Sequence, residues 1–163
     1  MKTVLFLLIF AFSWVPAQDV EDLQEGFFYA ENSRNFFRVE IARPFGLYKP
    51  ESCSDLSKFT RAQFEGGDEA FSRELFKYIS AYVDREIYVV NGPFFLHVSI
   101  NSKGDVENLE VTPKVPNSQS FIRDLKFAVT RIKKRWSPAV CNEVPVSSKI
   151  RIKLNFTSES VDL

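Results

Sequence analysis

A strand and a tight turn in the middle of the chain constrain its fold more than any other feature. From Pro93 to Asn101 apolar and polar side chains alternate, and the next residues, Asn-Ser-Lys-Gly-Asp, are typical of a β-hairpin turn. Gly104 can adopt the positive φ of such a turn because glycine has no Cβ atom. A second strand from Val106 to Val111 follows, with a β-bulge where its apolar residues change parity. This region therefore predicts an antiparallel β-hairpin.

Amphipathic helices are predicted on both sides of the hairpin. The first begins near Asp68, which we expect to cap it, and its apolar residues recur at helical spacing up to Val83. The second begins near Ser118, and its apolar stripe ends at Trp136. A last strand alternates from Ile150 to Phe156. This order predicts an α+β fold, a small antiparallel sheet with two helices packed on one face.

The first residues are typical of a cleavable export signal. A short basic start precedes an apolar run from Val4 to Val15, and Val15 and Ala17 suit the two positions that a signal peptidase recognises. About 12 apolar residues form a helix of roughly 18 Å, which is short against a hydrocarbon core of roughly 30 Å. We therefore expect cleavage after Ala17 and a periplasmic protein. A signal that stays attached would instead tether the protein to the membrane.

The residues between this signal and the first helix give weaker indications. Phe37, Val39 and Ile41 alternate with charged side chains, which favours a short hairpin or a single strand. The expected division of the chain is a signal peptide at 1–17, an aromatic extension of unknown role at 18–63, a folded domain at 64–157 and a flexible tail at 158–163.

Charge and cysteine content narrow the classes of partner. The sequence has 21 basic and 21 acidic side chains, so no global charge attracts nucleic acid, and we expect no nucleic-acid partner. Cys53 and Cys141 are an even pair in a chain expected to reach an oxidising compartment, which favours a disulfide. Two buried free thiols are the alternative. The spacing suits neither a metal site nor a redox pair, and no cofactor or metal is predicted.

Four motifs between Phe64 and Phe156 share their order and spacing with a known family. They are FEGGDEAF, HVSINSKGDV, RWSPAVCNEVPV and IRIKLNF. Together they resemble the C-terminal domain of TonB proteins, the energy transducers of Gram-negative envelopes. The residues expected to build that fold are Gly66, Gly67, Phe71, Gly104, Trp136, Pro138 and Pro145. Among them, we expect Trp136 to close the second helix and Pro138 to stop it.

The chain also departs from the family pattern. The Tyr-Pro dipeptide that usually follows the first helix is missing between Arg85 and Asn91. The sequence shows neither the transmembrane anchor nor the long proline-rich spacer of a conventional TonB. We therefore do not expect this chain to transmit force on its own.

The leading functional hypothesis is strand addition. The last strand is expected at a sheet edge, where unpaired N–H and C=O groups can pair with an extended peptide. The residues of that expected peptide-binding edge are Ile150, Arg151, Ile152, Lys153, Leu154, Asn155 and Phe156. The resemblance implies that the peptide belongs to an outer-membrane TonB-dependent receptor. Self-pairing through the same edge would give a homodimer.

Two other classes of function stay open. An accessory or structural envelope protein, without energy transduction, suits the missing anchor. An enzyme requires a base, a nucleophile or metal ligands in a fixed arrangement. The single histidine, His97, lies on a strand face with Phe95 and Ser99, and no serine lies in a nucleophile motif. We therefore expect a non-enzymatic binding module, with an outer-membrane receptor or another envelope protein as its partner.

Overall fold

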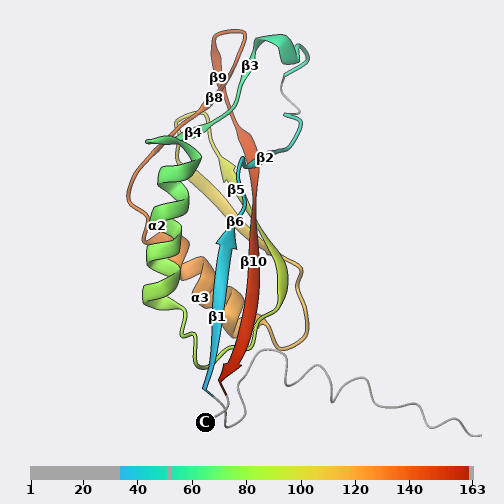
Figure 1. Cartoon of the computed structure of the whole chain (residues 1–163). Coiled ribbons are helices and arrows are strands. Elements are labelled where there is room, and N and C mark those ends of the chain that lie inside the picture. Colours follow the sequence, from blue (N-terminus) through green and yellow to red (C-terminus); the bar gives the residue numbers. More distant parts are fainter. Residues whose placement is uncertain (1–33, 51–52, 162–163) are drawn as a thin grey trace, which may run out of the picture.

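A five-stranded antiparallel sheet forms the centre of the molecule. The computed structural model describes residues 34–50 and 53–161, so the expected signal peptide at 1–17 lies outside them. Four strands follow the order β1-β10-β5-β6, and β2 pairs with another stretch of β10 (Figure 1). Their bounds are β1 (Arg34–Ile41), β2 (Gly46–Leu47), β5 (Gly92–Ile100), β6 (Val106–Thr112) and β10 (Ser148–Val161).

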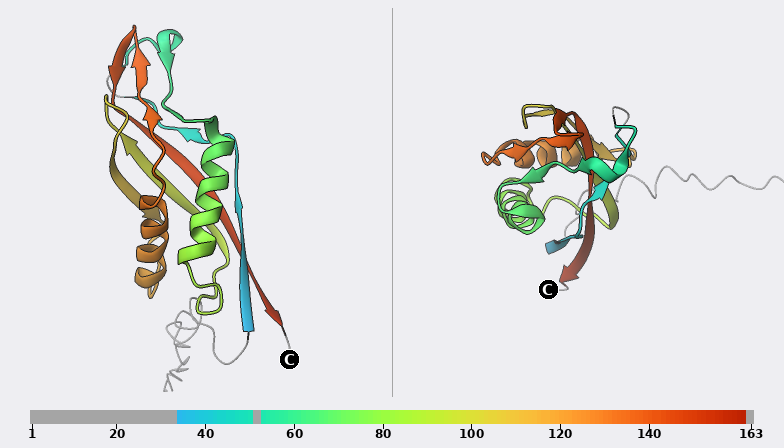
Figure 2. Two further views of the ribbon diagram at one scale, coloured as in Figure 1. Left: turned by 90° about the vertical axis from the view of Figure 1, so that its left-hand side faces the viewer. Right: turned by 90° about the horizontal axis from the view of Figure 1, so that it is seen from above.

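Two helices, α2 (Gly67–Tyr82) and α3 (Gln119–Thr130), lie on the same face of this sheet (Figure 2). Each buries one stripe of apolar side chains against the sheet. The most deeply buried of these are Phe71, Leu75 and Ile79 from α2 and Phe121, Leu125 and Ala128 from α3. The predicted α+β class is therefore confirmed. Neither helix, nor any other helix among the described residues, is long and apolar enough to cross a bilayer.

The start of α2 differs from the prediction. Gly66 caps the helix in the left-handed conformation, with φ of 87°, so the expectation that Asp68 is the cap was wrong. The Asp68 carboxylate instead accepts hydrogen bonds from the backbone N–H of Phe45 at 3.0 Å and from the Arg61 guanidinium at 2.9 Å. Its position in the first turn also suits the positive end of the helix dipole. Asp68 thus fastens the preceding segment to the helix.

The end of α3 differs as well. The helix ends at Thr130, and Trp136 lies beyond it in β7 (Trp136–Ser137), which pairs with β4 (Gln63–Phe64). The expectation that Trp136 closes the helix and that Pro138 stops it was therefore wrong. The physical reason is aromatic packing, because the Trp136 ring lies 5.3 Å from Phe64 and 5.1 Å from Phe71. Burial beside α2 outweighs continuation of the stripe on α3.

A second, smaller sheet lies at one end of the molecule, so the expected single sheet was incomplete. It consists of β3 (Phe59–Thr60), β8 (Ala139–Cys141) and β9 (Val144–Val146), and the short 3-10 helix η1 (Leu56–Lys58) precedes it. A disulfide joins Cys53 to Cys141 of β8, with their Cα atoms 5.8 Å apart, which confirms the predicted pairing.

The predicted hairpin of β5 and β6 is confirmed. Gly104 has φ of 86°, and a Cβ atom there would collide with the backbone oxygen of Trp136. The bulge also lies where the change of parity placed it: Ser99 pairs with Asn108 and Ile100 with Val106, which leaves Glu107 as the extra residue.

The last strand lies in the middle of the main sheet, which contradicts the expected open edge. On one side β10 pairs with β5 from Ser148 to Phe156. On the other side it pairs with β2 and with β1, and between them Ala42 N–H donates to Lys153 O at 2.9 Å. The backbone of Ile150 to Phe156 is therefore paired on both sides, and this segment offers no peptide-binding edge.

Strand β1, from the N-terminal extension, is the reason for this correction. Its eight residues pair antiparallel with β10, and the side chain of Phe37 is only 1% exposed. The Phe37 ring lies 5.4 Å from Phe156 and 6.4 Å from Phe121. Burial of this ring favours closure of the β10 edge by the chain itself. The pairing reaches Val161, so residues 158–161 of the expected flexible tail are strand.

Candidate functional site

The residues expected to build the family fold have structural positions. Phe64, Phe71 and Trp136 form one aromatic cluster, in which the Phe64 and Phe71 rings are 5.0 Å apart. Gly66 is the residue before α2, and a Cβ atom at this position would lie 2.8 Å from the Cβ atom of Ala70. Gly67 is the first residue of the helix. Pro138 follows β7, and Pro145 lies in β9. The aromatic cluster and Gly66 thus lie at the N-terminal end of α2, whereas Pro145 is an exposed residue of the small sheet.

An unpaired strand edge is the first candidate for a binding site. β1 ends the strand order of the main sheet, and its other side pairs with no strand in the part of the chain that the structure describes. Ala42 donates its N–H to β10, and partners alternate along an antiparallel ladder. Arg38 and Glu40 therefore direct their backbone groups to β10, whereas Phe37, Val39 and Ile41 direct theirs to the free edge.

The opposite end of the sheet is less suitable for an added strand. The bulge at Glu107 interrupts the regular ladder of β6. Bulges are a common device by which natural sheets protect their edges from further pairing. β1 has no register shift over its eight residues. We therefore take the free edge of β1 as the candidate site.

Helix α2 forms a wall beside this edge and leaves two hollows. The first, the Ile41 hollow, has a volume of about 380 Å³ and lies beside the N-terminal half of α2. Its apolar walls are Val39 and Ile41 from β1 and Phe76 from α2. Phe76 is 47% exposed, although it is a large apolar side chain. An apolar surface of this kind marks a candidate place for a partner's side chain.

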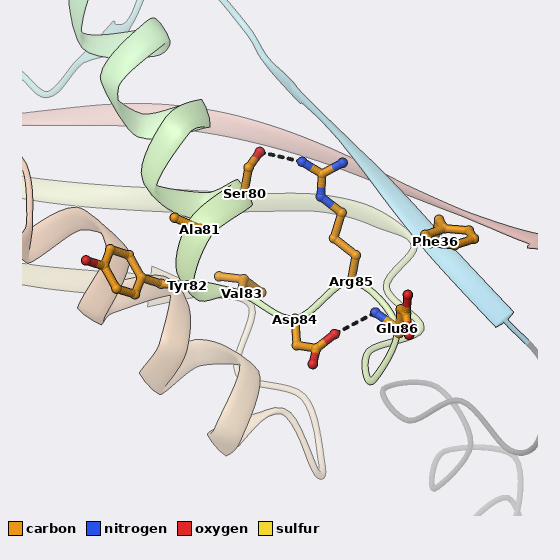
Figure 3. Close-up of a pocket in the computed structure, with 8 residues that line it drawn as sticks. All are labelled: Phe36, Ser80, Ala81, Tyr82, Val83, Asp84, Arg85 and Glu86. Atoms are coloured by element: carbon orange, nitrogen blue, oxygen red, sulfur yellow. Dashed lines mark hydrogen bonds between the residues drawn. The ribbon is translucent and has the colours of Figure 1, made fainter.

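The second, the Phe36 hollow, has a volume of about 540 Å³ and lies at the C-terminal end of α2 (Figure 3). The Phe36 side chain projects from β1, and residues 80–86 form the other walls. Arg85 donates to the Ser80 hydroxyl, and Asp84 accepts from the backbone N–H of Glu86 at 2.9 Å. We call the free edge of β1 together with the two hollows the β1–α2 cleft.

The charges of the cleft are exposed. Glu69 pairs with Arg73 at 3.0 Å and with Arg43 at 3.6 Å beside the Ile41 hollow. On β1, Arg38 pairs with Glu159 at 3.1 Å, and both side chains are at least half exposed. Glu40 forms no ion pair within the described ranges. Exposed pairs of this kind contribute little to stability and are open to exchange with a ligand's charges.

A second polar cluster surrounds His97, on the sheet face away from the helices. His97 is buried, with Nδ1 at 2.6 Å from the Tyr48 hydroxyl and Nε2 at 2.8 Å from the Thr112 hydroxyl. Both ring nitrogens are therefore engaged, since a hydroxyl can donate to one nitrogen and accept from the other. Burial, helped by the positive charges of Lys149 and Arg151, lowers the pKa of His97, and Glu110 opposes this shift.

The lowered pKa of His97 predicts a dependence of stability on pH. Histidine takes up its proton near pH 6.5 in an unfolded chain, and at lower pH in this fold. Between these values the unfolded chain binds more protons, so the free energy of unfolding should fall as pH drops from 7.5 towards 5.5. Urea denaturation at several pH values measures this slope. His97→Gln should flatten it, and an equal slope in the variant would contradict the assignment.

Sequence reasoning did not identify β1 and α2 as the two walls of a cleft. Phe36 and Phe76 are the clearest examples of its residues, because each is a large apolar residue on the polar side of its own element. Phe36 breaks the alternation of β1, and Phe76 lies off the stripe of Phe71, Leu75 and Ile79. This mismatch was the signal available in the sequence. The sequence did not show that β1 lies beside α2, because that placement depends on a long-range contact.

Comparison with known proteins adds no family assignment. Neither a protein-family model nor a curated protein nor a solved structure matches the chain. The likeness to the TonB C-terminal domain thus rests on the sequence motifs. Within residues 34–50 and 53–161, no group of three His, Cys, Asp or Glu side chains is placed to hold a metal ion.

Proposed function

We propose that this chain is an exported, non-enzymatic binding module of the Gram-negative envelope that takes up an extended peptide as an added strand on β1. The observation that carries the proposal is the unpaired edge of Phe37, Val39 and Ile41, with a hollow toward each end of it. An extended peptide can pair its backbone with that edge and place alternate side chains in the hollows.

The motif likeness suggests the source of the peptide. In TonB-type transport, the partner would be the N-terminal segment of an outer-membrane receptor, which the protein would meet in the periplasm. We place the proposed contact on β1 and not on β10, because β1 already occupies the edge of β10. We propose no catalytic role for His97, because the Tyr48 and Thr112 hydroxyls engage both of its ring nitrogens.

Peptide titration tests this proposal. Fluorescently labelled N-terminal peptides of outer-membrane receptors from the same genome should raise their anisotropy on addition of the protein. Val39→Pro should weaken binding by about tenfold or more, because it removes one outward N–H and blocks the edge. The fold should persist, since proline is tolerated on edge strands where the missing N–H faces outward.

Two N-methylated forms of the peptide provide the control. Methylation of the alternate N–H groups that face β1 should abolish binding, whereas methylation of the other alternate set should leave binding intact. Absence of binding to a protein whose circular dichroism is native would refute the proposal.

A further inference from the structure

The outer face of β1 carries two opposite charges beside the cleft. Arg38 and Glu40 point to the solvent-exposed face of the sheet, and between them Val39 points to the helix side, where it packs against the core and lines the Ile41 hollow. The Arg38 side chain is 78% exposed, and its ion pair with Glu159 is open to water. Glu40 has no ion pair within the described ranges. Two charges are therefore available to an added strand.

We infer that the peptide accepted by β1 reads basic, apolar, acidic from its N-terminus to its C-terminus. This inference rests on the proposed function and names its ligand class. Directly opposite residues of paired strands place their Cβ atoms about 4.5–5.5 Å apart, so charges of opposite sign attract there. An acidic residue belongs opposite Arg38, a basic residue opposite Glu40 and an apolar residue opposite Val39.

The direction of the peptide follows from the pairing geometry. An antiparallel strand meets Glu40 first and Arg38 last, which places the basic residue before the acidic one. Antiparallel pairing is the more stable of the two arrangements, and every pairing of the described strands is antiparallel. The apolar residue between the two charges then points towards the Ile41 hollow, whose wall includes Phe76.

Register is specified by the same charges. A shift of one residue keeps the hydrogen bonds opposite Phe37, Val39 and Ile41 but turns every side chain to the other face, which directs the peptide's charges towards the apolar walls of the Ile41 hollow. A shift of two residues keeps both the hydrogen bonds and the faces. Such a shift places one charge of the peptide opposite a like charge or outside the pair. The Arg38 and Glu40 pair thus selects both the order and the alignment of the ligand.

The occupant is a separate peptide and not a second copy of the chain. A second copy does carry the required order in Arg38-Val39-Glu40. It would also bring its own α2 to the same edge, whereas hollows of about 380 and 540 Å³ accommodate side chains and not a second helix. Sedimentation equilibrium separates the two occupants, and a dimer that the peptide dissociates would overturn this assignment.

Two peptides of identical composition test the inference, TVKVEVT and TVEVKVT, each labelled with a fluorophore. The first has the basic residue before the acidic one and should bind about tenfold more tightly, because both cross-strand pairs are attractive only in that order. The double variant Arg38→Glu with Glu40→Arg should reverse the preference. Lys103→Glu, in the β5–β6 turn, reverses one charge away from the cleft and should leave the preference between the two peptides unchanged.

The outcomes distinguish this inference from the function on which it rests. Equal binding of the two peptides, or a preference that the double variant leaves unchanged, overturns the charge rule and leaves strand addition standing. Tighter binding of TVEVKVT overturns the antiparallel direction. Binding of neither peptide, nor of any receptor peptide, to the folded protein overturns the proposed function itself. Urea midpoints of the variants confirm that each one is folded.

Discussion

Replacement of Phe37 by alanine is expected to lower the free energy of unfolding by about 3 to 5 kcal/mol. The Phe37 side chain is only 1% exposed, and its ring packs against Phe121 and Phe156 between the sheet and α3. Truncation removes most of that buried apolar surface and leaves a cavity that the neighbouring rings fill only in part. Urea denaturation followed by tryptophan fluorescence measures the loss.

Phe36 provides the matched control for this prediction. It is the same residue type on the same strand, but 39% of it is exposed, on the outer side of β1. Phe36→Ala should therefore lower the free energy of unfolding by no more than about 1 kcal/mol. A small effect of Phe37→Ala, similar to that of Phe36→Ala, would mean that β1 is not an integral strand and that the edge of β10 is open.

Loss of the disulfide is expected to have an effect of similar size. The bond between Cys53 and Cys141 closes a loop with a sequence separation of 88 residues. In the loop-entropy model, removal of such a crosslink releases the unfolded chain and lowers the free energy of unfolding by about 4 to 5 kcal/mol. The double variant Cys53→Ala with Cys141→Ala tests this by urea denaturation.

The reduced wild-type protein is the control for the disulfide. Dithiothreitol should destabilise the wild type by as much as the double substitution does, and it should not affect the double variant. The bond attaches the segment before η1 to β8, so its loss should act on the small sheet first. A loss below about 1 kcal/mol in the double variant would contradict the assignment of this bond as a main support of the fold.

The sequence predicted local structure better than strand pairing. The β5–β6 hairpin, its bulge at Glu107 and the two helices depend on side chains close together in the chain, and their periodicity is readable. The order of strands depends on contacts such as Ile41 with Leu154, whose residues are far apart in the chain. No pattern in β10 alone shows which strand lies beside it.

This limit explains why the predicted binding edge was wrong and the kind of binding stays a proposal. The last alternating segment, Ile150 to Phe156, was expected at a sheet edge because a mostly polar segment follows it, and the alternation of Phe37, Val39 and Ile41 indicated only a strand. With β1 placed beside β10, burial of Phe37 closes the edge of β10, and the outer side of β1 becomes the new edge of the sheet. Trp136 was misplaced for a similar reason, since its partners Phe64 and Phe71 precede the hairpin.

Amide hydrogen exchange along β1 tests the central claim most directly. In the free protein the N–H groups of Arg38 and Glu40 should exchange slowly, because they bond to β10, whereas those of Val39 and Ile41 should exchange quickly. Saturation with the TVKVEVT peptide should slow Val39 and Ile41 and change the other two little. Slow exchange of Val39 and Ile41 in the free protein, or no change when a bound peptide saturates the site, would contradict a peptide-accepting edge on β1.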